Sequence, residues 1–336
     1  MLPLLSFTMI RIGLAGVGHL GQHHNRLLER VENAVYAGCF DIDPSVQQEQ
    51  RKQGVQVYPS FQALVEDVDA VDIVTPTNEH FPLAKEALQA GKHVFIEKPM
   101  TETPAQAKEL IELAESHGLK LQIGHIERFN PAVRALRDFD LAPRFIESHR
   151  LAQFQPRGTE VAVILDLMIH DIDIILSLVD SPVAEVDASG VAVVTDSVDI
   201  SNARVTFENG CVANITASRI SQKAMRKLRI FQQSAYISID FLTQTTEIYR
   251  LKTAGNEESE SMPVILGEME FQGSKKYIVY EQPDIEESNA LLEELQTFVH
   301  AIHADERPVV SGEDGLRALE VARLIETKVA ESSVAQ

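Results

Sequence analysis

Short apolar runs alternate with helix-like patterns over the first third of the chain. Segments with the spacing of buried strands occur at residues 10–15, 35–40, 55–58, 71–75, 93–96 and 119–123. Residues 78–90 and 104–117 have the amphipathic spacing of helices, and Gly91 and Gly118 stand at their expected ends. Strands that alternate with helices are typical of parallel βαβ units, so these six strands predict a doubly wound parallel sheet.

After about residue 125 the pattern changes. An apolar helical stretch at residues 161–179 precedes alternating runs that are typical of half-buried strands, at residues 191–194, 201–207, 211–218, 228–231 and 236–241. Asn209-Gly210 lies between two of these runs and predicts a tight hairpin.

The end of the chain is again helical. Residues 286–303 and 312–330 have amphipathic patterns, whereas the polar and acidic residues 255–261 predict a solvated loop. We therefore predict an α/β protein of two domains. Residues 9–124 form the domain with the parallel sheet, and residues 125–336 form an α+β domain around an open, mainly antiparallel sheet.

The net charge and the cysteine content indicate which binding partners and which cell compartment suit the protein. The formal net charge of −20 argues against nucleic acid, whose backbone demands basic patches, and against an anionic membrane surface. Cys39 and Cys211 lie far apart in apolar runs, which indicates neither a disulfide framework nor a zinc site and makes the cytoplasm the simplest setting. Residues 1–8 lack a basic start, a cleavage site and the length of a membrane span, so we expect a disordered or alternatively started extension before Met9.

A glycine-rich turn follows the first apolar run. The turn is Gly16-Val17-Gly18-His19-Leu20-Gly21, and Asp41 comes twenty positions after it, at the end of the second run. Such glycines let the backbone approach a pyrophosphate at a helix N-terminus, and the carboxylate accepts hydrogen bonds from a ribose 2′-hydroxyl while repelling a 2′-phosphate. The pattern predicts a dinucleotide site that takes NAD rather than NADP. A glycine turn without a ligand is the alternative.

Further candidate residues fall on the same edge of the predicted sheet, because ligands of such sheets bind beyond the carboxyl ends of the strands. These are residues 75–78 and Glu97-Lys98-Pro99. Lys98 is placed to favour the negative charge that develops on a hydroxyl oxygen as hydride leaves, and a cis bond before Pro99 would fix its direction. Taken alone, a lysine on a loop is more often an ordinary surface residue.

The apolar helix of the second half carries a polar stripe. Asp166, His170 and Asp173 stand at i, i+4 and i+7 and therefore share one face. Burying such groups is costly unless partners or a ligand compensate them, which makes the stripe a candidate site. The alternative is a helix cap or a set of hydrogen bonds to neighbouring loops. Asp171 lies on a different face and is expected to be structural, and Asp173 either supports His170 or acts locally.

Taken together, the motifs resemble the Gfo/Idh/MocA family of oxidoreductases. The resemblance covers nearly the whole chain in the same order, and it rests on the glycine motif, Thr75-Pro76 with His80, Glu97-Lys98-Pro99, Arg128-Phe129-Asn130-Pro131 and the helix with Asp166, His170 and Asp173. It implies an N-terminal Rossmann domain and a C-terminal domain whose open sheet commonly makes homodimer or homotetramer contacts.

The resemblance also implies roles for individual residues. Contacts with NAD are expected from Gly16, Gly18, His19, Leu20, Gly21, Asp41, Thr75, Pro76, Asn78, His80, Glu97 and Lys98. Catalysis is assigned to His170 as general base on a sugar hydroxyl, to Asp166 as an orienting group, and to Lys98 as a bridge between that hydroxyl and the nicotinamide ribose. No metal is needed. His23 and His24 are interpreted as ordinary helix residues near the pyrophosphate.

Within the family, residues 16–24, 124–131 and 165–173 are most similar to enzymes that oxidise the C3 hydroxyl of UDP-N-acetylglucosamine. Their ketone product is converted by a partner aminotransferase to an amine for lipid A. Expected substrate contacts are Lys98, Arg128, Asn130, Arg157, Asp166 and His170, and Arg150 and Arg219 are further candidates for the diphosphate, although each arginine alone is more often a surface or ion-pairing residue. Glu160-Val161-Ala162-Val163 replaces the Gly-Gly of many relatives, which predicts a different pocket mouth.

Two other functions remain open at this point. One is a dehydrogenase of a free sugar or an inositol that uses the same Lys98, Asp166 and His170. The other is a non-catalytic NAD-binding sensor, since a fold does not establish an activity. The complete polar stripe argues against the sensor.

Overall fold

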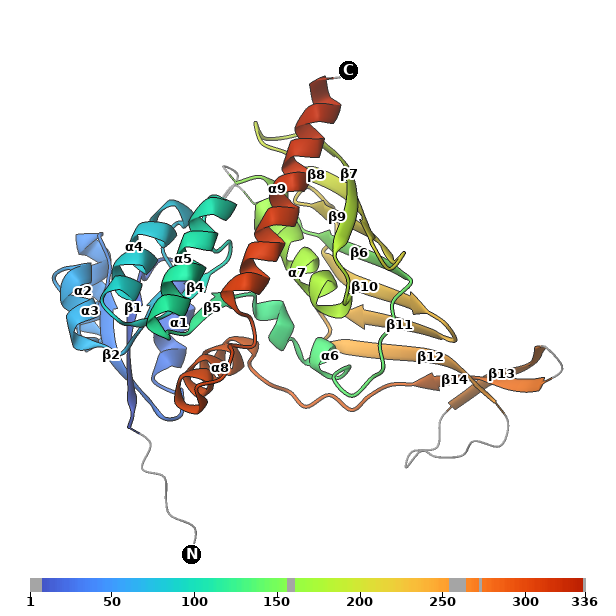
Figure 1. Ribbon diagram of the computed structural model, residues 1–336, viewed down its shortest axis with the longest axis horizontal. Coiled ribbons are helices and arrows are strands. Elements are labelled where there is room, and N and C mark those ends of the chain that lie inside the picture. Colours follow the sequence, from blue (N-terminus) through green and yellow to red (C-terminus); the bar gives the residue numbers. More distant parts are fainter. Residues whose placement is uncertain (1–7, 156–160, 254–263, 272–273, 335–336) are drawn as a thin grey trace, which may run out of the picture. The chain divides into compact units, whose positions relative to one another are not determined.

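The computed structural model describes residues 8–155, 161–253, 264–271 and 274–334, and the chain divides into two compact units (Figure 1). The first unit comprises residues 1–129 and 289–320, and the second comprises residues 130–288 and 321–336. Each unit is built on its own sheet. Across the described ranges, no helix combines the length and the apolar character that a membrane span requires.

The sheet of the first unit is parallel, with the strand order β2-β1-β3-β4-β5. Its strands are β1 (Ile10–Ala15), β2 (Ala34–Phe40), β3 (Ala70–Ile73), β4 (His93–Glu97) and β5 (Leu121–Gly124). The helices between them are α1 (Gly21–Leu28), α2 (Pro44–Lys52), α3 (Phe61–Asp67), α4 (Thr77–Gln89) and α5 (Pro104–His117). The strand order reverses at β1, so the carboxyl ends of β1 and β3 form the switch point at which such sheets bind ligands.

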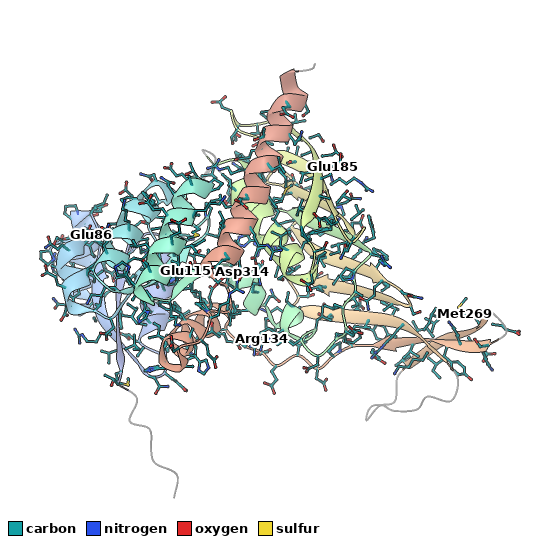
Figure 2. All side chains as sticks on the ribbon, viewed as in Figure 1. Glu86, Glu115, Arg134, Glu185, Met269 and Asp314 are labelled. Carbon is teal, nitrogen blue, oxygen red and sulfur yellow. The ribbon has the colours of Figure 1, made fainter. Side chains whose placement is uncertain are left out.

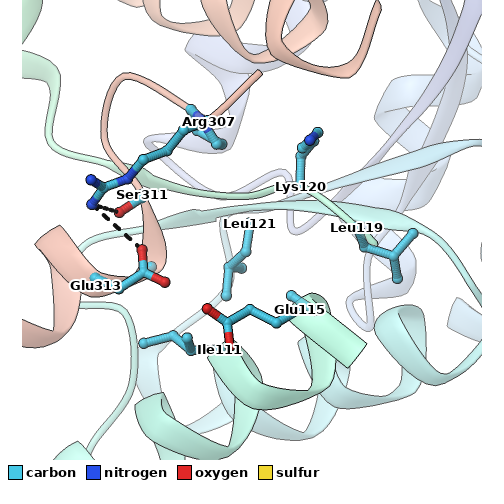
Figure 3. Close-up of a pocket in the computed structure, with 11 residues that line it drawn as sticks. Ile111, Glu115, Leu119, Lys120, Leu121, Arg307, Ser311 and Glu313 are labelled. Carbon is cyan, nitrogen blue, oxygen red and sulfur yellow. Dashed lines mark hydrogen bonds and ion pairs between the residues drawn. The ribbon is translucent and has the colours of Figure 1, made fainter. Parts of the chain in front are cut away.

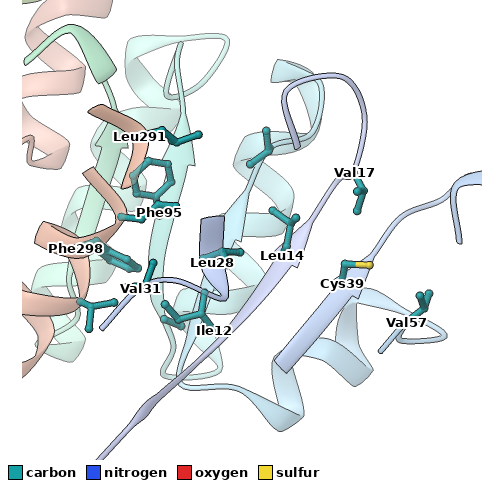
Figure 4. Close-up of a cluster of buried hydrophobic side chains, with 14 residues drawn as sticks. Ile12, Leu14, Val17, Leu28, Val31, Cys39, Val57, Phe95, Leu291 and Phe298 are labelled. Atoms are coloured by element: carbon teal, nitrogen blue, oxygen red, sulfur yellow. The ribbon is translucent and has the colours of Figure 1, made fainter. Parts of the chain in front are cut away.

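A cluster of apolar side chains covers one face of this sheet (Figure 4). Ile12 of β1 and Phe95 of β4 pack there with Leu28 of α1 and with Phe298 of α8 (Ala290–Ala304). The rings of Phe95 and Phe298 meet edge to face with their centroids 5.9 Å apart. Each fully buried side chain of this size stabilises the fold by about 1.5–3 kcal/mol, so α8 belongs to the core of the first unit although it comes from the far end of the chain.

The outcome for this unit is mixed. Helix α5 has the bounds expected from the sequence, with a capping box of Thr103 and Gln106 at its start and Gly118 in the left-handed region at φ 65° at its end. The prediction of six strands is wrong: residues 55–58 make only an isolated bridge between Val57 and Cys39, and Pro59 then ends the pairing. The return of residues 289–320 to this unit also differs from our domain division, because an amphipathic pattern does not say which sheet buries it.

The sheet of the second unit has nine strands in the order β13-β14-β12-β11-β10-β6-β9-β8-β7. Neighbours are antiparallel except for β6 and β9, which are parallel. The strands are β6 (Phe145–Leu151), β7 (Val183–Val191), β8 (Ile200–Phe207), β9 (Val212–Ser218), β10 (Met225–Gln232), β11 (Ala235–Asp240), β12 (Thr245–Thr253), β13 (Val264–Phe271) and β14 (Ser274–Glu281). The expected α/β class with a mainly antiparallel second sheet is confirmed.

The two faces of the second sheet differ in character. Ile146, Ile230, Ile237 and Ile248 are buried on the face that carries the helices α6 (Pro131–Arg134) and α7 (Ile169–Leu178). The sequence neighbours of these isoleucines and of the buried Val279 point to the opposite face. They form an unbroken row of rings across five strands, with centroids 5.0–5.7 Å apart: Phe145, Phe231, Tyr236, Tyr249 and Tyr280. Alternation of this kind is expected of a sheet with one covered face.

Several details of the second unit were not predicted from the sequence. The strand expected at residues 191–194 is wrong, since β7 ends at Val191 and the next residues form a loop whose N–H groups, at Val193 and Val194, donate to the Asp199 carboxylate. The hairpin at Asn209-Gly210 is confirmed, with Gly210 at φ 83° between β8 and β9. The loop expected at residues 255–261 lies outside the described residues, as does most of the expected extension at residues 1–8.

Two further elements are helix α9 (Gly312–Val334) and the η1 turn (Ile126–Phe129). Acidic side chains lie on the outside of both units: Glu86 on α4, Glu115 on α5 and Glu185 on β7 are all exposed (Figure 2). The net charge of −20 is therefore carried at least partly by solvated groups.

Candidate active site

The glycine turn lies at the carboxyl end of β1. Gly16 has φ 90°, and a Cβ there would come within 2.8 Å of the Val74 carbonyl oxygen, so only glycine fits. A Cβ at Gly21 would collide with the Gly16 carbonyl, whereas one at Gly18 would meet nothing within 4 Å. Residues 18–20 are exposed, and α1 begins after Leu20 without a side-chain cap. The turn therefore presents open space and uncapped N–H groups, which suit a pyrophosphate.

Asp41 follows β2 and faces this turn. One of its carboxylate oxygens accepts the Val17 N–H at 2.7 Å, and the other accepts the Asp43 N–H at 2.9 Å. These bonds hold the carboxylate next to the glycine turn and leave lone pairs for ribose hydroxyls. The sequence-based placement of Asp41 beside the turn is thus seen in the structure.

Two loops beyond β3 and β4 are joined by His80. Its Nδ1 lies 2.9 Å from the Pro99 carbonyl oxygen and its Nε2 lies 2.8 Å from the Thr75 carbonyl oxygen. Burial lowers the pKa of His80 against the opposing effect of these carbonyls. The ring is buried and both nitrogens are engaged, so His80 orders the two loops rather than reaching the cofactor directly. Pro76 and Asn78 remain exposed beside it.

The Glu97-Lys98-Pro99 turn ends β4 on the same rim, and the Lys98–Pro99 bond is cis. The Glu97 carboxylate turns inward. One oxygen accepts the Lys98 backbone N–H at 3.1 Å, and the other lies 3.2 Å from Nε2 of His24. Glu97 was expected to contact NAD, but its two oxygens serve the interior and the turn itself.

His24 is the functional candidate that the sequence analysis missed. It was interpreted as an ordinary helix residue, yet it is fully buried, and its Nδ1 lies 2.8 Å from a carboxylate oxygen of Asp72 on β3. The only available signal was a polar Asp72 inside the otherwise apolar run of β3.

The polar stripe of the second unit begins in a π-helical turn, η2 (Ile164–Met168), which runs directly into α7. Asp166 belongs to the π turn and His170 to the first turn of α7, and both are partly exposed, whereas Asp173 is buried. Single π turns within helices occur frequently at functional sites, because the extra residue changes which side chains face outward. The sequence predicted one continuous α-helix here, and the π turn is the difference.

Asp171 is structural, as expected. It accepts hydrogen bonds from the Ser148 hydroxyl at 2.7 Å and from Nε of Arg150 at 2.5 Å, and Asp171 and Arg150 are both buried. The bidentate geometry ties α7 to β6. Arg150 is therefore committed to Asp171 and is not a diphosphate ligand, which corrects one expectation.

The other expected substrate residues have mixed placements. Arg219 is buried and donates to the Val161 carbonyl, so it supports the start of η2 instead of meeting a substrate. Asn130 caps α6 through the Ala132 N–H at 3.1 Å. Arg128 lies 3.9 Å from the Asp314 carboxylate. Arg157 and Glu160 lie outside the described residues.

A cavity of about 410 Å³ lies at the amino end of β5, between the end of α5 and residues 307–313 (Figure 3). The glycine turn, Asp41 and Glu97 follow the carboxyl ends of their strands, so this cavity is not the cofactor site. Among the described residues, no group of three or more His, Cys, Asp or Glu side chains is placed to hold a metal ion.

The first sheet with its glycine turn and acidic β2 end defines an NAD-binding domain of the Rossmann type. A family model described as "Oxidoreductase family, NAD-binding Rossmann fold" matches residues 10–125, and a GFO/IDH/MocA C-terminal domain model matches residues 123–238. Together with the relatives below, these matches show that the chain belongs to the Gfo/Idh/MocA oxidoreductase family. The expected family, cofactor and enzyme class are confirmed.

Known relatives cover nearly the full length. The UDP-N-acetylglucosamine 3-dehydrogenase of Acidithiobacillus ferrooxidans is 40% identical over 95% of this chain and 97% of its own. The myo-inositol 2-dehydrogenase of Thermotoga maritima is 27% identical over 92% and 93%. A solved structure of the A. ferrooxidans enzyme superposes with a TM-score of 0.84 at 38% identity, covering 95% and 97%. The apo scyllo-inositol dehydrogenase of Lactobacillus casei, at 23% identity and a TM-score of 0.76, matches over 97% of each chain and supports the fold.

The placement of Asp41 predicts a change of cofactor preference. Asp41→Asn removes the charge that repels a 2′-phosphate and keeps the side-chain size. We expect the ratio of kcat/KM for NADP to that for NAD to rise roughly 10- to 100-fold, the value of one hydrogen bond to a charged group. Glu49→Gln on the exposed face of α2 removes the same charge nearby and should leave the ratio unchanged. An unaltered ratio in Asp41→Asn would contradict the assignment.

Proposed function

We propose that this protein oxidises a secondary hydroxyl of a nucleotide sugar with NAD, and that this hydroxyl is at C3 of UDP-N-acetylglucosamine. The choice of substrate is supported by 40% identity, over 95% of the chain, to an enzyme of that name. The observation that carries the chemistry is the pair Asp166 and His170, both partly exposed on a helix that is otherwise mostly buried. An imidazole in this setting can take up and return a proton near neutral pH.

The proposed roles follow from the chemistry of each group. His170 removes the hydroxyl proton as general base, and Asp166, four residues earlier, orients the substrate or the imidazole. Lys98, on the turn after β4, stabilises the negative charge that develops on the hydroxyl oxygen. When bound, NAD supplies the hydride acceptor. In this proposal the NAD contacts are supplied by the glycine turn, Asp41 and the loop at Thr75.

A diphosphate substrate also requires cations. With Arg150 and Arg219 engaged in the interior, Arg128 and Arg157 remain the candidates that we propose, and Lys98 and Asn130 remain candidates for the sugar. The product would be a 3-keto sugar, which an aminotransferase can convert to an amine, and lipid A is its proposed destination. We place the reaction in the cytoplasm, where Cys39 and Cys211, both buried, would stay as free thiols.

One assay tests the proposed substrate. The protein is incubated with NAD, an aminotransferase and its amino donor, and with UDP-N-acetylglucosamine, UDP-glucose, myo-inositol or scyllo-inositol in parallel. The aminotransferase removes the ketone and so pulls the unfavourable oxidation forward. We expect the fastest NADH formation, followed by absorbance, with UDP-N-acetylglucosamine.

The other outcomes are equally informative. Faster turnover of an inositol would support the free-polyol dehydrogenase and contradict our proposal. NADH binding without any turnover would support the sensor. Mass spectrometry of the aminated sugar distinguishes C3 from other positions, and amination at another carbon would overturn the regiochemistry.

We also propose that the protein is a homo-oligomer, as a homodimer or homotetramer, through the open face of the second sheet. The support is the row of five rings from Phe145 to Tyr280, because extended apolar patches on a sheet face are typical of interfaces. Light scattering gives the mass directly, and a monomer at micromolar concentration would contradict this proposal.

A further inference from the structure

A buried imidazole lies between two carboxylates inside the first unit. His24 on α1 is fully buried, its Nδ1 is 2.8 Å from Asp72 on β3, and its Nε2 is 3.2 Å from Glu97 on β4. Asp72 is also fully buried, and Glu97 nearly so. The edge of the ring meets Phe95, with centroids 5.9 Å apart. Asp72 and Glu97 lie 48 and 73 positions after His24 in the sequence. The three titratable side chains, from three elements, therefore form a continuous row Asp72–His24–Glu97 inside the first unit.

The arrangement fixes the charge of the ring. Burial alone lowers the pKa of His24, but the charges and hydrogen bonds of Asp72 and Glu97 outweigh it and hold that pKa well above 6.5. Burial likewise opposes ionisation of Glu97, yet the hydrogen bond and charge of His24, with Lys98 next, hold the pKa of Glu97 below 4.5. Burial raises the pKa of Asp72 against the effect of His24. Both ring nitrogens of an imidazolium are donors, which matches an acceptor on each side.

The row Asp72–His24–Glu97 ends at the Glu97-Lys98-Pro99 turn. The second oxygen of Glu97 accepts the backbone N–H of Lys98 at 3.1 Å, and the chain continues into Pro99. Space for this carboxylate depends on Gly124 of β5, where a Cβ would lie 2.8 Å from the Glu97 carboxyl carbon. His24 therefore binds one oxygen of the Glu97 carboxylate, and the absence of a side chain at Gly124 leaves room for that carboxylate. The other oxygen of Glu97 binds the backbone of Lys98, the residue that we assign to catalysis.

We propose that His24 is a positioning residue of the active site, which fixes the Glu97 carboxylate and, through it, the direction of Lys98. Asp72 is the counter-charge that keeps His24 in place. The inference rests on the proposed role of Lys98, but the state of His24 can be measured without any substrate. The buried carboxylates of Asp72 and Glu97 would repel each other without the cation between them. The imidazolium of His24 therefore keeps both carboxylates in their positions.

The first test uses the unmodified full-length protein. Histidine labelled with ¹⁵N is followed by long-range ¹H–¹⁵N NMR between about pH 5.5 and 8.5, a range that brackets the ordinary histidine pKa. We expect the His24 ring to keep its imidazolium shifts to a higher pH than an ordinary histidine. His23, the preceding residue of the same helix, is exposed, and partial desolvation together with Arg26 lowers its pKa, so it should lose its proton at a lower pH. If the His24 ring loses its proton at or below the ordinary histidine pKa, the proposal is wrong.

The second test is the variant His24→Gln, with His117→Gln on exposed α5 as the control. We expect kcat to fall by up to about 100-fold, as misplacement of a catalytic group by about 1 Å can do, with a smaller change in the KM of the sugar. The pH profile should also change. Without the cation the pKa of Glu97 rises, so protonation of Glu97 sets in at a higher pH as the pH falls, and the acid limb of kcat moves to higher pH. An unchanged profile would contradict the proposal.

The double variant His24→Gln/Asp72→Asn separates positioning from packing. Removing the second negative charge relieves the repulsion on Glu97, so the acid limb should move back toward its original position. A purely structural role of His24 predicts instead additive losses. If a variant does not fold, the NMR test on the unmodified protein still decides whether His24 carries the charge that the proposal requires. If no sugar is turned over, the proposed function fails, whereas NADH affinity still tests the positioning role. That affinity should weaken about tenfold in His24→Gln, because Lys98 is assigned to the nicotinamide ribose.

Discussion

His170→Ala is expected to lower kcat by roughly 10²- to 10⁴-fold, the range that a positioned general base contributes. The imidazole is the group on the polar stripe that can remove a hydroxyl proton near neutral pH, and truncation to alanine removes it while leaving the helix intact. The dissociation constant of NADH should not change, because none of the expected NAD contacts is assigned to His170. Stopped-flow kinetics and NADH fluorescence titration measure the two quantities.

Two further measurements sharpen this prediction. Added imidazole should restore part of the lost rate in His170→Ala, since a free base can enter the space of the deleted side chain. His300→Ala, on an exposed histidine of α8, should behave as the unmodified protein. A rate within threefold of the unmodified protein in His170→Ala, a change of less than about 0.7 kcal/mol in the barrier, would exclude His170 as the base.

The polar groups of α7 show how much of such a site a sequence can indicate. The i, i+4, i+7 spacing placed Asp166, His170 and Asp173 on one face and set Asp171 apart, and the structure confirms that Asp171 has a separate, structural role. What the spacing did not indicate is the π turn at residues 164–168 and the partial exposure of Asp166 and His170, since the whole stripe was expected to be buried. Both depend on how the helix packs against the sheet, which no local pattern encodes.

The strands follow the same logic. Runs such as residues 10–15 and 93–96 were recognised because parallel strands buried on both faces are apolar throughout. Residues 55–58 have a similar composition but pair only at Val57, since Pro59 removes a donor directly afterwards. Strands β12 to β14 were not predicted because their sequences mix polar and apolar residues, which weakens the alternation by which a half-buried strand is recognised.

His24 illustrates the remaining limit. Its two partners, Asp72 and Glu97, come from β3 and β4, which are distant in the sequence. The sequence alone therefore shows an isolated histidine after a glycine motif, which is interpreted as an ordinary helix residue. The sequence also places Glu97 on the rim but not its direction, which the structure shows to be inward. Local motifs therefore predict which residues stand near the chemistry, and long-range pairing decides which of them touch it.

Lys98→Ala is expected to lower kcat by roughly 10²- to 10³-fold, about 3–4 kcal/mol of lost stabilisation, as when one donor to a developing oxyanion is removed. The ammonium acts on charge that grows only as hydride leaves carbon, so the KM of the sugar should change less than kcat. Lys98→Arg keeps the charge but not the compact geometry and should recover only part of the rate. Lys85→Ala, an exposed lysine of α4 paired with Glu109, is the matched control and should leave kcat unchanged. If Lys98→Ala raised KM alone and kept kcat, the lysine would be a binding residue, and another group would have to stabilise the charge on the reacting oxygen.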